Sequence, residues 1–196
     1  CHGVSLAPST IAGFGNAFSQ ALSPFMEKVE QNVKAAPVVH LDETGFRMGG
    51  KTCWLHVAST PRLTWYRISA KRNDVAALVG ILGTLMHDHW KTYYSNDVFK
   101  GNAHGLCNSH HLRELKAVAE LDGDRWARHL QRLLRFALHV THANQGVVPL
   151  PLAERIVLLY HILLERAVAM YEARPPFDPK GRAKRIGHNL ALRLLQ

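Results

Sequence analysis

The sequence predicts a mixed α/β fold followed by an all-helical region. Short apolar segments rich in β-favouring residues lie between Pro37 and Cys107. Before and after this stretch, apolar residues recur three to four positions apart, which is the helical period. We therefore expect an N-terminal helical segment over residues 1–36, a sheet-containing core over 37–122 and an all-helical region over 123–196.

The N-terminal segment has the pattern of two helices. Ile11, Phe14 and Phe18 recur at helical spacing. Ser23-Pro24 can start a second helix, because proline is favoured in a first helical turn. The apolar stripe predicts that this segment packs into a core.

The sheet region opens with a meander. The apolar run 38–41 predicts a buried strand that ends at Asp42, in front of the turn sequence Glu-Thr-Gly. Residues 52–58 and 63–68 are rich in aromatic and β-branched residues, which predicts a hairpin. Three successive strands of this kind favour an antiparallel arrangement.

Helical and strand patterns then alternate. Asn73 and Asp74 can cap a helix over residues 75–82. A fourth strand over 84–87 leads into Asp88, and a fifth over 102–107 precedes a helix that begins near His110.

Two long helices dominate the rest of the chain. One has an apolar face and, opposite it, a basic face. The other, over 151–173, is apolar on more than half its circumference, so we expect it to be largely buried. A proline-rich linker over 174–179 precedes a basic cluster. The basic face comprises Arg128, Arg132, Arg135 and His139, and the basic cluster comprises Lys180, Arg182, Lys184 and Arg185.

Composition favours a globular protein with a polyanionic partner. Hydrophobic residues make up 47% of the chain, and 24 Lys and Arg against 15 Asp and Glu give a net charge of +9. Nucleic acid is the leading partner, although many basic proteins bind none. The three separated cysteines fit a reducing cytoplasm, and no segment is long and apolar enough to cross a membrane.

Asp42 and Asp88 are the candidate catalytic and metal-binding residues. Each follows a short apolar strand, and a hairpin and a helix separate the two. If the two strands lie side by side in parallel, both carboxylates emerge at the same sheet end, where α/β folds place ligands. Carboxylate pairs suit Mg²⁺ or Mn²⁺. The alternative is that each aspartate only accepts hydrogen bonds in a turn.

Four sequence blocks, in order and spacing, resemble transposases of the insertion-sequence 66 family. They are VHLDETGFR (39–47), WLHVAST (54–60), HDHWK (87–91) and LCNSHHLREL (106–115). The resemblance implies a ribonuclease-H-like fold and DNA transposition by phosphoryl transfer. Asp42 and Asp88 would be the first two acids of a DDE triad that holds two Mg²⁺ or Mn²⁺ ions, in a complex that acts as a homo-oligomer.

The third acid of that triad, a glutamate, has no counterpart that we identify before Gln196. We expect it further along a longer protein, and we expect this chain to be inactive alone. Glu114 is a candidate substitute, and Glu43 is a candidate turn residue or support for the metal ligands.

Two other functions stay open. The chain could be a non-catalytic DNA-binding or assembly module, or a zinc-dependent hydrolase that uses His87, His89 and His110. Besides the basic face and the basic cluster, Lys71 and Arg72 are candidates for DNA contact.

Overall fold

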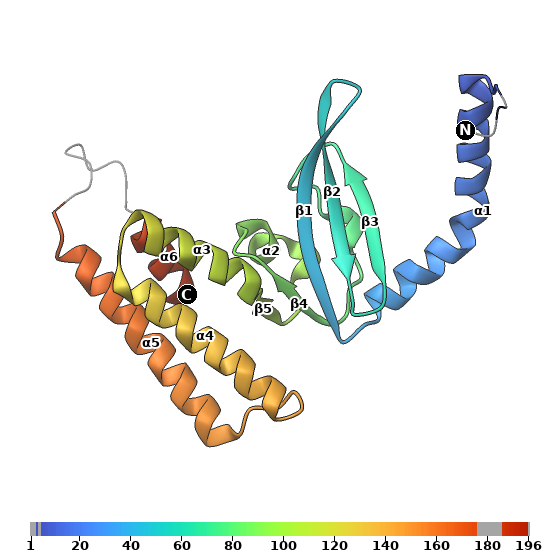
Figure 1. Ribbon diagram of the computed structural model, residues 1–196. Coiled ribbons are helices and arrows are strands. Elements are labelled where there is room, and N and C mark those ends of the chain that lie inside the picture. Colours follow the sequence, from blue (N-terminus) through green and yellow to red (C-terminus); the bar gives the residue numbers. More distant parts are fainter. Residues whose placement is uncertain (1–2, 4, 176–185, 196) are drawn as a thin grey trace. The chain divides into compact units, whose positions relative to one another are not determined.

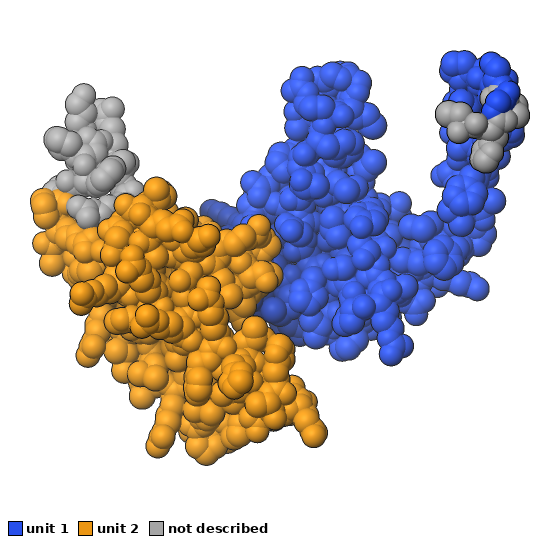
Figure 2. Space-filling model, viewed as in Figure 1, with its two compact units in different colours: residues 1–106 blue, residues 107–196 orange. Residues whose placement is uncertain are grey.

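The computed structural model describes residue 3 and residues 5–175 and 186–195 (Figure 1). The chain divides into two compact units, residues 1–106 and residues 107–196 (Figure 2). None of the helices within the described ranges is long and apolar enough to cross a membrane.

The first unit is built on a five-stranded sheet with strand order β3-β2-β1-β4-β5. β1, β2 and β3 pair antiparallel, whereas β4 and β5 continue the sheet parallel to β1. The predicted mixed α/β class is therefore confirmed. The strands are β1 (Val38–Met48), β2 (Lys51–Ser59), β3 (Thr64–Ser69), β4 (Thr84–His87) and β5 (His104–Leu106).

β1 is longer than the sequence predicts, because it continues past Asp42 to Met48. Residues 40–48 of β1 pair in register with β2. The turn at Gly49-Gly50 has φ angles of 55° and 77°, a conformation that glycine adopts without steric cost. Asp42 thus lies inside a strand of the meander, although the parallel pairing of β1 with β4 extends only from Val38 to His40.

The core of this unit lies on one face of the sheet. Val39, Leu41 and Leu85 point to this face, where buried side chains of α2 (Lys91–Ser95) and of the 3-10 helix η2 (Asp97–Phe99) cover them. The helix predicted over 75–82 is wrong. Only the 3-10 turn η1 (Ala76–Leu78) forms there, and Gly80, with φ of 88°, leaves helical geometry.

α1 (Pro8–Lys34) is one helix, so the prediction of two helices is wrong. Pro24 lies inside it, and the Ser23 hydroxyl donates to the Ser19 carbonyl oxygen at 3.4 Å in the preceding turn. In this helix only Val29 and Val33 are buried.

The predicted core stripe of α1 is also wrong in its N-terminal half. Ile11, Phe14 and Phe18 are 59%, 62% and 67% exposed. The physical reason is that α1 packs on β3 through its C-terminal turns, while its N-terminal part runs beyond the sheet (Figure 1).

The described residues of the second unit form helices only, and this unit begins at residue 107, whereas the expected helical region began at 123. Its core joins all four helices through Leu115, Leu130, Leu164 and Leu190. Beside this core, buried Asp124 accepts hydrogen bonds from Tyr171 (2.5 Å) and Arg174 (2.6 Å). The helices are α3 (Asn108–Leu121), α4 (Arg125–Ala143), α5 (Leu150–Glu172) and α6 (Ile186–Leu195).

The expectation that the second long helix is largely buried is wrong. Val157, Leu158 and Leu159 of α5 are 55%, 59% and 48% exposed. α5 packs against α4 and α6, which cover only part of its circumference.

Candidate carboxylate site beside β1 and β4

The two candidate aspartates extend from neighbouring parallel strands. Val38 pairs with Thr84 and His40 with Met86, and the same sequence offset separates Asp42 from Asp88. If the pairing continued two residues past its last pair, His40–Met86, this offset would bring Asp42 beside Asp88. Because side chains alternate along a strand, Asp42 also points away from the face that buries Leu41.

Each aspartate has a local hydrogen bond. The Oδ1 atom of Asp42 accepts from the Glu43 backbone N–H at 2.9 Å. The Oδ1 atom of Asp88 accepts from the Trp90 N–H at 2.9 Å, which is the turn role that the sequence left open. This bond fixes the orientation of the Asp88 carboxylate at the start of α2.

Tyr93 of α2 is influenced by the negative charges of three carboxylates. Its side chain is 1% exposed, and its hydroxyl donates to Glu43 Oε2 at 2.7 Å. Burial raises the pKa of Tyr93, and the negative charges of Glu43, Asp88 and Asp42 raise it further. The hydroxyl therefore lies within the electrostatic reach of all three acids.

Glu43 is the buried member of this group, with a side chain only 2% exposed. Its Oε1 atom accepts from Arg72 Nε at 2.9 Å and from a terminal nitrogen of the same guanidinium at 2.5 Å. That guanidinium stacks over Trp90, 4.5 Å from the ring centroid, and over Trp54 at 5.3 Å. Glu43 thus ties β1 to α2 through Tyr93 and to the segment after β3 through Arg72.

These contacts bear on two sequence predictions. Glu43 binds Tyr93 and Arg72 inside the fold, and its role as support for metal ligands stays a prediction. Arg72, a candidate for DNA contact, pairs its guanidinium with Glu43, whereas Lys71 is exposed.

His87 is a fully buried residue between the sheet and α2. Its Nδ1 atom lies 2.5 Å from the Asp88 carbonyl oxygen, so Nδ1 carries the proton and donates. Its Nε2 atom lies 2.8 Å from His104 Nδ1 and accepts from it. Burial lowers the pKa of His87, which favours the neutral ring.

The zinc alternative finds no support in this geometry. Both ring nitrogens of His87 are engaged in hydrogen bonds. In the described part of the chain, no three His, Cys, Asp or Glu residues are grouped so as to hold a metal ion.

The remaining candidates lie in the second unit. Glu114 accepts from Arg193 at 3.1 Å. All four residues of the basic face on α4 are exposed. The basic cluster of Lys180, Arg182, Lys184 and Arg185 lies outside the described residues.

Sequence reasoning missed Tyr93 and the pairing of Glu43 with Arg72. The signal for Tyr93 was available, since two tyrosines follow Asp88 within six residues. The partners of Glu43 carried no such signal, because Arg72 is 29 positions away and Tyr93 is 50.

Comparison with known proteins gives one match. No curated protein and no solved structure matches the chain. The model of the family described as Transposase IS66 family matches residues 1–149, most of the 196 residues and all of the first unit. The predicted resemblance is confirmed, and the chain belongs to the IS66 family of transposases.

Proposed function

We propose that this chain contributes Asp42 and Asp88 to a metal-dependent phosphoryl-transfer site of a DNA transposase. Family membership makes it a DNA-transferring enzyme, with DNA as its partner. The observation that carries the proposal is the parallel register of β1 and β4, whose sequence offset is the same as that between Asp42 and Asp88. The influence of both charges on Tyr93 supports it independently.

The donor chemistry fits a hard divalent cation. Carboxylate oxygens suit Mg²⁺ or Mn²⁺, and two neighbouring carboxylates repel each other unless a cation lies between them. When bound, such ions activate an attacking water or hydroxyl and stabilise the leaving oxygen of an in-line displacement. Asp42 and Asp88 would hold the ions.

The surrounding residues would position the two aspartates. The Asp88 carboxylate is oriented by the Trp90 N–H, and the Glu43–Tyr93 hydrogen bond joins the strand that carries Asp42 to the helix that follows Asp88. Small displacements of such groups cost much activity, because the reaction needs its partners in one geometry.

The sheet topology supports the ribonuclease-H-like assignment that the family resemblance implies. An antiparallel meander of β3, β2 and β1 is followed by parallel β4 and β5. In this order β1 lies at the centre of the sheet, and its first residues pair with β4 over a buried core.

The test is the pair of variants Asp42→Asn and Asp88→Asn in the complete transposase. We expect each to lower cleavage at the transposon ends and strand transfer at least about a hundredfold. Titration calorimetry with Mn²⁺ should show weaker binding to both variants. Glu154→Gln, which removes an exposed acid of α5, is the matched control and should leave both readouts unchanged.

The opposite outcome is also informative. Full strand transfer and full Mn²⁺ binding in both aspartate variants would refute the catalytic assignment. That result would favour the non-catalytic DNA-binding or assembly module.

A further inference from the structure

Asp88 follows directly after the paired part of β4. The pairing of β4 ends at Met86 on its β1 side and at His87 on its β5 side. The ladder hydrogen bonds that join neighbouring strands therefore do not reach the carbonyl group of Asp88. Another group has to hold this carbonyl if the residue is to keep one orientation.

His87 supplies a hydrogen bond at this point. The Nδ1 atom of its ring lies 2.5 Å from the Asp88 carbonyl oxygen and donates to it, because a carbonyl oxygen can only accept. The ring thus takes the place of a ladder partner for the residue that follows it.

The position of His87 in the core is unusual for a polar side chain. β4 has two buried side chains, Leu85 and His87, and both are 0% exposed. Leucine is common at such a position, whereas an imidazole loses its hydrogen bonds to water there. This loss is offset only when both ring nitrogens find partners inside the fold. The two hydrogen bonds of His87 therefore explain why the core tolerates a histidine here.

His104 of β5 is the second partner of this ring. Because Nδ1 of the neutral His87 ring carries the proton, its Nε2 atom accepts, and His104 Nδ1 donates to it at 2.8 Å. The rings of Tyr93 and Tyr94 contact the same imidazole, with centroids 4.6 Å and 5.0 Å away. His104 thus favours the tautomer that donates to Asp88, and the tyrosines hold the ring in place.

We propose that His87 is a positioning residue for Asp88. Its Nδ1–H holds the Asp88 carbonyl, and His104 keeps the ring in the tautomer that can donate. This role rests on the proposed function, in which Asp88 holds a metal ion. His87 acts on the reaction only through Asp88.

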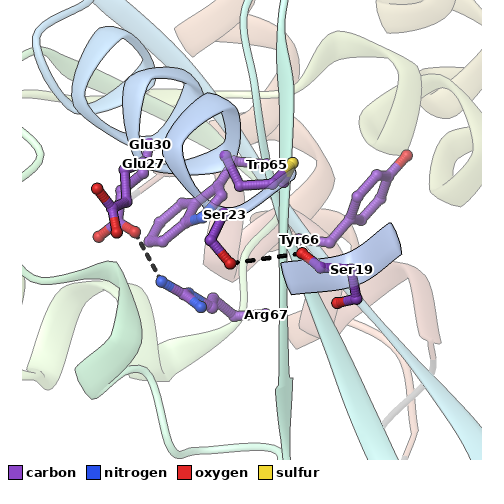
Figure 3. A pocket seen from close by; sticks show the side chains of 8 residues that line it. Ser19, Ser23, Glu27, Glu30, Trp65, Tyr66 and Arg67 are labelled. Atoms are coloured by element: carbon purple, nitrogen blue, oxygen red, sulfur yellow. Dashed lines mark hydrogen bonds and ion pairs between the residues drawn. The ribbon is translucent and has the colours of Figure 1, made fainter. Parts of the chain in front are cut away.

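Asp42 needs no such partner, because the sheet itself holds it. It pairs with Val57 of β2, within a ladder that runs from residue 40 to residue 48 of β1. β2 pairs in turn with β3, and β3 is tied to α1 by the ion pair of Arg67 with Glu30 at 2.6 Å. Figure 3 shows this ion pair at the cavity between α1 and β3. Of the two candidate ligands, only Asp88 lies past the end of its ladder.

Loss of the His87 hydrogen bond should weaken the site without removing it. Groups that orient a metal ligand typically contribute about 10–100-fold to metal affinity or activity. Mg²⁺ demands near-ideal octahedral geometry, whereas Mn²⁺ tolerates more distortion of its ligands. A displaced Asp88 should therefore lower the rate with Mg²⁺ more than the rate with Mn²⁺.

The test compares His87→Asn with His87→Gln in the complete transposase. The amide nitrogen of asparagine takes the place of Nδ1 and can donate to the Asp88 carbonyl, whereas that of glutamine takes the place of Nε2 and cannot. We expect kcat of strand transfer by His87→Gln to fall about 10–100-fold, with an unchanged KM for DNA and a lower ratio of the Mg²⁺ rate to the Mn²⁺ rate. His87→Asn should keep most of the activity and the original ratio.

His111→Gln is the matched control, because His111 is a 3% exposed histidine of the second unit. Whatever stability this variant loses, its ratio of Mg²⁺ to Mn²⁺ rates should equal that of the unmodified enzyme. A lower ratio in His87→Gln alone therefore reports displacement of Asp88 and not a general loss of folded protein.

A second measurement needs no activity. A long-range proton–nitrogen correlation spectrum of the isotope-labelled chain distinguishes the two tautomers of each imidazole, and His87→Asn identifies the His87 signals. We expect the His87 proton on Nδ1, and we expect the Nε2–H tautomer to appear in His104→Leu. His104 is exposed, so this variant should fold. A proton on Nε2 of His87 in the unmodified chain would overturn the proposal.

Equal losses in His87→Asn and His87→Gln, or an unchanged ratio of rates in His87→Gln, would also overturn it. Failure of the positioning role is distinguishable from failure of the metal site. If Asp88→Asn abolishes strand transfer and His87→Gln does not reduce it, only the role of His87 is refuted. If Asp88→Asn keeps full strand transfer, both proposals are refuted.

Discussion

Adjacent residues of β1 have opposite environments. Asp42 is exposed, whereas the side chain of Glu43 is buried and bonded to Arg72 and Tyr93. Strand alternation makes this difference inevitable once one face of the sheet is covered. One acid can therefore bind a ligand while its neighbour holds the surroundings in place.

Glu43→Gln should lower the free energy of unfolding. Glutamine keeps an acceptor for Tyr93 but loses the charge that pairs with Arg72. Arg72 is 45% exposed and water screens the pair, so we expect a loss of about 1–3 kcal/mol. Urea unfolding of the variant measures this, with Glu154→Gln as the control. A change below about 0.5 kcal/mol would show that the buried contact contributes little.

His56 should make stability depend on pH. Burial lowers its pKa from the ordinary value of 6.5, against the opposing effects of Glu43 and the Lys71 carbonyl. Below pH 6.5 the unfolded chain takes up a proton that the folded chain resists, so the free energy of unfolding falls with falling pH. The slope from this ring is at most about 1.4 kcal/mol per pH unit. His56→Gln should reduce this slope below about pH 6.5, measured against exposed His161→Gln as the control.

The junction of β1 with β4 is the element on which the candidate site depends. The Thr84 N–H donates to the Pro37 carbonyl oxygen at 2.9 Å, and this bond begins the parallel register. Gly83 lies at the same point. A Cβ atom there would come within 2.2 Å of the Ala36 carbonyl oxygen and 2.5 Å of that of Pro37, so only glycine allows the approach.

Gly83→Ala should therefore displace β4 relative to β1. We expect a loss of about 1–3 kcal/mol in the free energy of unfolding and, in the complete transposase, a loss of strand transfer. Gly13→Ala is the control, because a Cβ atom there meets nothing within 4 Å and alanine favours a helix. Wild-type stability and activity of Gly83→Ala would contradict this account of the register.

At the scale of the whole molecule, the two units of the chain differ in secondary structure and in the charged residues that they carry. The first unit holds the sheet and the candidate carboxylates, and the second unit holds the exposed basic face on α4. A family of DNA-transferring enzymes needs both chemistry and phosphate contacts. We therefore expect the basic face to contact DNA phosphates.

Combined replacement of Arg128, Arg132 and Arg135 by alanine should weaken binding to duplex DNA of any sequence. The logarithm of the binding constant should also fall less steeply with the logarithm of salt concentration, by about 0.9 for each phosphate that the variant no longer neutralises. Fluorescence anisotropy at several salt concentrations measures this slope. The control removes equal charge elsewhere through Lys28→Ala, Lys116→Ala and Arg155→Ala. Equal slopes in both triple variants would show that only net charge matters.

The sequence by itself determined the α/β class, four of the five strands to within a few residues, the helical second half and the family. These are properties of local period and motif, which neighbouring residues encode. The helix expected over 75–82 failed because packing against the sheet and Gly80 outweighed its apolar pattern.

Only the tertiary structure decided which apolar stripes are covered and which acids are buried. Ile11, Phe14 and Phe18 have the pattern of a core helix, yet whether a sheet lies beneath them depends on chain segments far away. Glu43 and Asp42 are adjacent acids, and only the pairing of β1 with its neighbours assigns one to the interior and the other to the surface. The period of apolar residues predicts that a helix or strand has an apolar face, whereas long-range packing decides which residues cover that face.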